Sequence, residues 1–204
     1  MNKVIVYIDG FNLYHGLVDK GWRRYLWLNV QKMASSLLKF NQELVETKYF
    51  TARITVGDAA KKQRQTTYIE AIKTLNGLII IEGKYHSESY LCHNCGFTHN
   101  IPSEKMTDVN IASQMIIDAV NDKLDTALLV SADADLVPAI EIIRSAYAKK
   151  RIVVAFPPNR YSKDLANSAQ SSYFIGRMHF AKNQLEEKVT RADGFILERP
   201  KTWI

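Results

Sequence analysis

One segment organises the rest of this sequence: Leu128-Leu129-Val130-Ser131-Ala132-Asp133-Ala134-Asp135-Leu136-Val137-Pro138. The apolar run from Ala127 to Val130 predicts a buried strand. Apolar residues then return at helical spacing, at Leu136, Ile140 and Ile143, so a helix begins soon after the strand ends. The two carboxylates between them therefore lie at the carboxyl end of a strand, where open α/β sheets bind their ligands.

These carboxylates admit two interpretations. Asp133 and Asp135 repel each other unless a proton or a cation lies between them, which favours a cation site. Alternatively, Ser131 or Asp133 simply caps the helix, a position that Ser and Asp prefer. Two more acids at comparable positions favour the cation site, because Asp9 ends the first predicted strand and Asp108 opens a later helix.

Composition sets broad limits on the class of protein. The chain has 204 residues, enough for one α/β domain with a small insertion and a tail. Its net charge of +6 permits a polyanionic partner without requiring one. Two cysteines exclude a disulfide framework. No apolar run reaches the length of a signal-peptide core or a membrane span, so we expect a cytoplasmic protein without a membrane partner.

Short apolar strands alternate with amphipathic helices along the chain. The predicted strands are Val4–Ile8, Leu44–Ile54, Leu78–Ile81, Ala127–Val130, Arg151–Phe156 and Ser172–Ile175. This alternation predicts an α/β fold with a mostly parallel sheet and helices on both faces. Right-handed crossovers then bring the carboxyl ends of the strands to one edge.

The turn after the first strand carries the second polar group. In Asp9-Gly10-Phe11-Asn12, Gly10 allows the backbone to turn sharply. Asn12 either caps the following helix or holds a substrate or a metal-bound water through its amide. In the helix that Asp108 opens, Asp118 lies off the apolar stripe, so we expect Asp118 to be a surface residue.

Residues 83–104 form an irregular insertion with a CxxC motif at Cys92 and Cys95. This spacing is typical of a zinc-knuckle turn, but a structural zinc ion needs four ligands. Further candidate ligands are the flanking residues His86 and His99, and also His93. The alternative is a pair of reduced thiols in a β-hairpin.

Basic residues occur in two relevant places. Lys61, Lys62 and Arg64 lie near the start of a predicted helix, where a solvated face is the usual role and phosphate contact is the alternative. Arg160 and Lys163 follow the strand Arg151–Phe156, so they are placed to meet an anionic ligand at the same edge as the acids.

Two segments keep two interpretations each. Residues 22–28 combine aromatic residues with arginine, and they either stack on bases and meet phosphates or place their aromatic rings in the core. The charged tail 177–204 docks either on this domain or on a second copy of the chain, so the sequence leaves the choice between monomer and homo-oligomer open.

Three motifs together resemble a known family. The sequences YIDGFNLYHG, EKMTDVNIASQMIIDA and LLVSADADLVPAIE, in this order and spacing, are similar to those of NYN-domain proteins, the LabA or DUF88 group of the PIN-like nucleases. The resemblance covers residues 1–176 and leaves 177–204 as a tail. It implies a PIN-like three-layer α/β/α sandwich with a mostly parallel central sheet and, at 83–104, a small cysteine-containing insertion.

The same resemblance implies a metal-dependent ribonuclease site. Asp9, Asp108 and Asp133 are then the metal-binding acids, Asp135 is a further acid, and Asn12 and Ser131 are supporting polar groups. Relatives often carry another acid before the last strand, where this chain has Ser171 and Ser172. The absence of that acid argues against a second metal ion but does not affect the expectation of a first.

The chemistry of such an acid cluster agrees with this expectation. Carboxylate oxygens without nitrogen or sulfur ligands suit Mg²⁺ or Mn²⁺, which can activate water against a phosphodiester. We expect single-stranded RNA as the substrate, with its backbone neutralised by Lys105, Arg160 and Lys163. Two alternatives are an RNA-binding or adaptor module with little turnover, and a phosphohydrolase for a small molecule.

Overall fold

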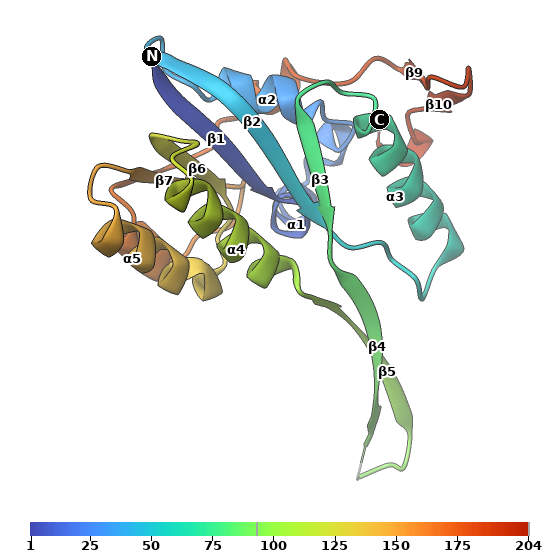
Figure 1. Ribbon diagram of the computed structural model, residues 1–204. Helices are drawn as coiled ribbons and strands as arrows, with labels where there is room; N and C mark the ends of the chain where they lie inside the picture. The colour runs from blue at the N-terminus through green and yellow to red at the C-terminus, as the bar shows by residue number, and fades with distance from the viewer. Residues whose placement is uncertain (93, 204) are drawn as a thin grey trace.

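A six-stranded, entirely parallel sheet forms the centre of the protein. The computed structural model describes residues 1–92 and 94–203, with only the backbone described at 86–89 and 99–103 (Figure 1). The sheet has the strand order β3-β2-β1-β6-β7-β8. Its strands are β1 (Asn2–Asp9), β2 (Gln42–Thr51), β3 (Leu78–Glu82), β6 (Thr126–Val130), β7 (Arg151–Phe156) and β8 (Ser171–Phe174). The predicted α/β class is confirmed.

Helices cover both faces of this sheet. One side carries α1 (Gly10–Asp19), α2 (Val30–Ser36) and α3 (Ala59–Ile72), and the other carries α4 (Thr107–Val120), α5 (Val137–Ala146) and α6 (Lys163–Ser168). Side chains of β1 alternate between the two layers, since Val6 and Ile8 pack on the α1 side and Ile5 and Tyr7 on the α4 side. The result is a three-layer α/β/α sandwich.

The connections place a crevice at the end of β1. The chain runs from β1 outward through β2 to β3, and later enters β6 on the opposite side of β1. The direction of strand order therefore reverses between β1 and β6. In an open parallel sheet, ligands bind outside the carboxyl ends of the strands at such a reversal.

Residues 83–104 are more regular than expected. Instead of an irregular insertion they form a hairpin of β4 (Lys84–Leu91) and β5 (Thr98–Lys105), paired from Lys84↔Lys105 to Leu91↔Thr98. Figure 1 shows this hairpin extending away from the sandwich. Its polar strands lack the alternating apolar pattern that identifies a half-buried strand, because neither face of the hairpin covers the core.

The tail docks on its own domain. It contains α7 (Arg177–Ala181), the short strands β9 (Lys188–Thr190) and β10 (Ile196–Glu198), and the 3₁₀ turn η3 (Lys201–Trp203). Phe180, Leu185 and Trp203 are buried, and the Trp203 ring lies 5.8 Å from that of Tyr68 in α3. Within the described residues no helix is long and apolar enough to cross a membrane.

The aromatic segment at 22–28 also belongs to the core. It includes the 3₁₀ turn η1 (Arg23–Tyr25), and the rings of Tyr25 and Trp27 are buried. Trp27 Nε1 donates a hydrogen bond to the carbonyl oxygen of Glu186 in the tail, at 2.7 Å. These two rings are therefore unavailable for stacking on bases.

Asp118 corrects a prediction. It was expected on the surface, but it is fully buried, with Lys48 Nζ at 2.5 Å and the Tyr7 hydroxyl donating to it at 2.8 Å. The buried stripe of α4 includes Ile111 and Met115 and is rotated toward Asp118. The apolar pattern of α4 alone could not show this, because the closer of its two cations, Lys48, comes from β2, while Lys123, just after α4, lies 3.5 Å from the carboxylate.

Candidate functional site: an acidic cluster at the ends of β1 and β6

Asp9 is the most enclosed acid of the cluster. It ends β1 and is only 4% exposed. Its Oδ1 accepts a hydrogen bond from the Asn12 backbone N–H at 2.9 Å, so Asp9 caps α1, and its Oδ2 accepts from the Ser131 hydroxyl at 2.9 Å. The prediction that Asn12 caps this helix is therefore wrong. The Asn12 amide oxygen instead accepts from the Ala132 N–H at 3.2 Å and ties α1 to the loop after β6.

The loop after β6 is held by its own side chains. The Ser131 hydroxyl is buried and also accepts a hydrogen bond from the Asp133 N–H at 3.1 Å. Asp133 Oδ1 in turn accepts from the Asp135 N–H at 2.9 Å and caps the 3₁₀ turn η2 (Ala134–Leu136). Asp133 is half-buried, whereas Asp135 is exposed. Asp133 therefore both caps the 3₁₀ turn η2 and belongs to the acidic cluster.

Two more acids approach from the α4 side. Asp108 lies in the first turn of α4 and is half-buried. Glu104 lies near the end of β5 and accepts a hydrogen bond from the Thr107 hydroxyl. Glu104 was not among the predicted site residues. It precedes Asp108 by four positions within the EKMTDV motif, but only the path of β5 shows that it reaches the cluster.

The carboxyl groups raise one another's pKa values. Burial raises the pKa of Asp9 to about 6, and Asp108 and Asp133 add to the shift against the two hydrogen bonds that lower it. Burial, with Asp9 and Asp108 nearby, raises the pKa of Glu104 to about 7. Burial also raises the pKa of Asp108, together with Asp133 and Asp135. All the neighbouring charges that act on these three groups are negative, so a cation would relieve the repulsion.

The donor set fits a hard divalent cation. The cluster offers only carboxylate and amide oxygens, which suit Mg²⁺ or Mn²⁺. In the described part of the chain, however, no three His, Cys, Asp or Glu side chains converge closely enough to hold a metal ion as they stand. Mg²⁺ usually keeps several waters and is held by one or two carboxylates plus substrate phosphates. The arrangement therefore fits ligation through water better than a closed protein cage.

The predicted basic residues lie at different places around the cluster. Lys105 directly follows Glu104 at the end of β5, and Lys163 begins α6, which packs against η2. Arg160 pairs with Asp19 at the far end of α1. Arg160 is thus drawn along α1 away from the acids, and Lys105 and Lys163 lie on the elements that border the cluster.

The CxxC motif forms the tip of the hairpin. The Cys92 N–H donates to the Phe97 carbonyl at 2.9 Å, and the Gly96 N–H donates to the Cys92 carbonyl at 2.8 Å. The side chains of His86 and His99, and all of His93, lie outside the described residues. The strand register pairs His86 with Ser103 and Tyr90 with His99. His99 therefore lies opposite a position four residues beyond His86, so the backbones of the two histidines are about 13 Å apart along the strands. A zinc ion at this tip stays a prediction.

The fold and its acidic edge define the class of protein. A parallel sheet between two helical layers, with carboxylates at the reversal of strand order, is a PIN-like α/β/α sandwich. The chain belongs to the NYN domain family, whose model matches residues 3–176. The family resemblance read from the three sequence motifs is thereby confirmed.

Two known proteins are similar to this chain. One is 6-hydroxy-3-succinoylpyridine 3-monooxygenase HspA from Pseudomonas putida (strain DSM 28022 / S16), 29% identical over 187 residues. The alignment covers 74% of this chain and only 58% of that relative's length. The other is the crystal structure of a protein of unknown function, VPA0982, from Vibrio parahaemolyticus RIMD 2210633. Its TM-score is 0.55 at 21% identity, covering 90% of this chain and 96% of that one, so it supports the fold alone.

Proposed function

We propose that this protein is a metal-dependent ribonuclease that hydrolyses phosphodiester bonds in single-stranded RNA. The observation that supports it best is the gathering of Asp9, Glu104, Asp108 and Asp133 from separate segments at one sheet edge, with no positive charge among the groups that shift their pKa values. Membership of a family with a PIN-like nuclease fold points to the same chemistry.

The three aspartates would hold Mg²⁺ or Mn²⁺, directly or through water. When bound, such an ion would acidify the attacking water and stabilise the leaving oxygen. Asp9 is oriented for this role by the Asn12 N–H and by the Ser131 hydroxyl. The same hydroxyl accepts from the N–H of Asp133, so it fixes two of the three aspartates relative to each other.

Glu104 is suited to accept the proton of the attacking water. A general base works best when its pKa lies near the operating pH, and that of Glu104 is raised to about 7. Its Oε1 accepts from Thr107, and its Oε2 has no hydrogen-bond donor among the described residues. Lys105 and Lys163 would neutralise the RNA backbone on either side.

The test compares cleavage of a labelled single-stranded RNA by the wild-type protein and by Asp133→Asn, with Mg²⁺, Mn²⁺ or EDTA. The matched control is Asp125→Asn, since Asp125 precedes β6 at the opposite end of the same strand and accepts from the Lys3 N–H. We expect EDTA and Asp133→Asn to reduce the rate about 10²-fold or more, and Asp125→Asn to leave it unchanged. Equal cleavage by wild type and Asp133→Asn would reject the assignment.

A second candidate is an RNA-binding module of the same fold with little turnover. The observation in its favour is that no three candidate ligands in the described residues converge on one metal position. RNA binding that survives both EDTA and Asp133→Asn, without cleavage under any condition, would favour this second function. A steep loss of affinity with salt would mark the binding as contact with phosphates.

A further inference from the structure

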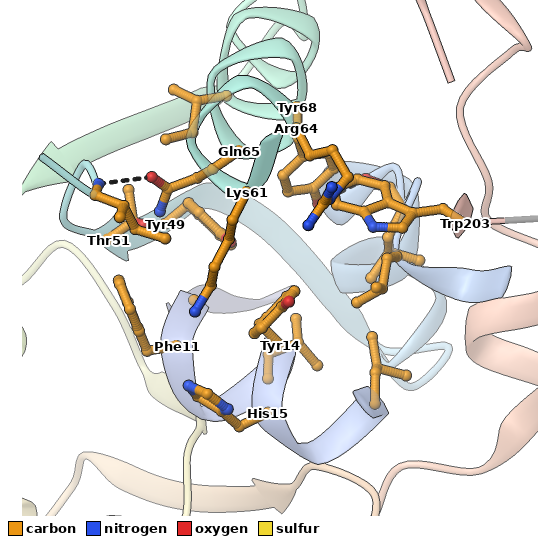
Figure 2. Close-up of a pocket in the computed structure, with 17 residues that line it drawn as sticks. Phe11, Tyr14, His15, Tyr49, Thr51, Lys61, Arg64, Gln65, Tyr68 and Trp203 are labelled. Carbon is orange, nitrogen blue, oxygen red and sulfur yellow. Dashed lines mark hydrogen bonds between the residues drawn. The ribbon is translucent and has the colours of Figure 1, made fainter. Parts of the chain in front are cut away.

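A partly open cavity of about 70 Å³ lies between α1 and α3 (Figure 2). It begins at Gly10 and Phe11, the two residues that follow Asp9. Aromatic rings from four parts of the chain line it, namely Phe11 and Tyr14 of α1, Tyr49 of β2, Tyr68 of α3 and Trp203 of the tail. None of the roles described above uses this cavity.

The hydroxyl of Tyr49 is an unused polar group in the cavity. Tyr49 is 6% exposed, and burial, together with Asp9 and Glu104, raises its pKa above the usual range. Its hydroxyl has no hydrogen-bond partner among the described residues, whereas buried tyrosine hydroxyls usually have one. By contrast, the Tyr68 hydroxyl donates to the Leu28 carbonyl at 2.9 Å. Tyr49 therefore offers a polar contact to a molecule that enters the cavity.

The opening of the cavity is positively charged. Figure 2 shows Lys61 reaching from α3 toward Phe11, Tyr14 and His15 of α1. Lys61 has no acidic partner among the described residues, whereas Arg64 lies 3.8 Å from Asp58. Burial lowers the pKa of His15, and the positive charges of Arg160 and Lys61 lower it further. A positive opening thus adjoins a negative cluster.

These features specify the chemistry of a ligand. Aromatic side chains stack on a planar ring, and a lysine beside them suits an anionic group attached to that ring. At about 10–15 Å³ of such volume for each water molecule, the cavity has room for roughly five to seven waters, which is enough for a planar aromatic base. The Tyr49 hydroxyl can contact a polar atom on the ring edge.

We propose that this cavity binds the base of a nucleotide next to the phosphodiester at the acidic cluster, with Lys61 neutralising the phosphate of that nucleotide. The inference rests on the proposed ribonuclease function, since it names the subsite that holds the base beside the phosphodiester. The cavity is well placed to hold a base beside the acidic cluster, because Phe11 lies two residues after Asp9 and Tyr49 pairs with Ile8 in the sheet.

The test measures binding of UMP and of ribose 5-phosphate, which lacks the base, by isothermal titration calorimetry with EDTA present. We expect UMP to bind at least fivefold more tightly than ribose 5-phosphate. Tyr49→Phe removes one hydroxyl and should weaken UMP binding about 2- to 10-fold, and Lys61→Gln should weaken it about tenfold or more. Lys62→Gln, the matched control, removes the same charge from the neighbouring position, which does not line the cavity, and should change affinity less than twofold.

The outcomes separate this inference from the ribonuclease proposal, because nucleotide binding needs no cleavage. Equal affinity for UMP and ribose 5-phosphate, or an affinity that neither Tyr49→Phe nor Lys61→Gln lowers, would overturn the inference even if RNA is cleaved. Pyridine-3-carboxylate, an aromatic anion without a sugar or phosphate, serves as a competitor. If it binds more tightly than UMP, the cavity is a site for aromatic carboxylates and the nucleotide assignment is wrong.

Discussion

Replacing Asp9 with asparagine should stabilise the metal-free protein at neutral pH. Burial and the neighbouring acids raise the Asp9 pKa from its ordinary 3.8 to about 6. Keeping this carboxylate ionised costs the folded state about two pKa units, or about 3 kcal/mol at 1.36 kcal/mol per unit. Asparagine carries no charge, and Asn and Asp are about equally good caps, so the bond from the Asn12 N–H is kept. Losing the acceptor for the Ser131 proton costs about 1 kcal/mol, which leaves a gain of about 2 kcal/mol.

The pH dependence of this gain has a definite sign. Because the Asp9 pKa is raised in the folded state, its protonated form contributes stability that is fully present below pH 3.8 and is lost as the pH rises through about 6. The asparagine variant has no such loss. The gain of the variant in unfolding free energy should therefore be complete near pH 8 and absent near pH 4, where only the cost of about 1 kcal/mol for the lost Ser131 hydrogen bond remains.

Urea unfolding at these two pH values, with EDTA present, measures the effect. A gain of about 2 kcal/mol corresponds to about 4–8 °C in Tm for a chain of this length. The control is Asp58→Asn, because Asp58 caps α3 in the same way but on the surface, and it should change stability by less than about 0.5 kcal/mol. An Asp9→Asn protein that is less stable than wild type at pH 8, or equally stabilised at pH 4, would refute the reasoning.

Three further predictions follow from the packing and from the cluster. Lys48→Met removes the closer of the two cations paired with the buried Asp118, leaving Lys123 Nζ at 3.5 Å, and should cost about 3 kcal/mol in urea unfolding, whereas a cost below about 1 kcal/mol would show that the Lys48–Asp118 pair is not buried in solution. Trp203→Ala empties a site against Tyr68 and should cost about 3–5 kcal/mol; an unchanged midpoint would mean that the tail does not dock. Mg²⁺ at 100 times its Kd should stabilise the wild type by about 2.7 kcal/mol and stabilise Asp133→Asn much less, and equal thermal shifts for both would contradict the proposed ligands.

The layers of the fold could be predicted from sequence because each depends on a local pattern. Short runs rich in apolar and β-branched residues indicate the six parallel strands, which are four to ten residues long in the structure, and the helices between them carry apolar stripes. The position of Asp9 and Asp133 at one edge follows from the same reasoning, because Asp9 ends one parallel strand and Asp133 lies three residues after the end of another. Their role in binding a metal stays a prediction.

The features that the sequence did not reveal depend on pairing between distant segments. Glu104 reaches the cluster only because β4 and β5 pair along their whole length and return the chain to the sheet edge. The closest partner of the buried Asp118 is Lys48, seventy residues away in the sequence. The cavity near Tyr49 needs the last residues of the chain, since Trp203 forms part of its wall. No periodicity within one element carries this information.

One hydroxyl couples two of the proposed metal ligands. Ser131 donates to the carboxylate of Asp9 and accepts from the backbone of Asp133, so a change at either acid alters the hydrogen bonding of the other. Effects on residues that share a partner are not additive. The losses of cleavage rate, expressed as free energies, for the single Asp9 and Asp133 variants should therefore sum to more than the loss for the double variant. A double-mutant cycle that includes Ser131→Ala measures the excess.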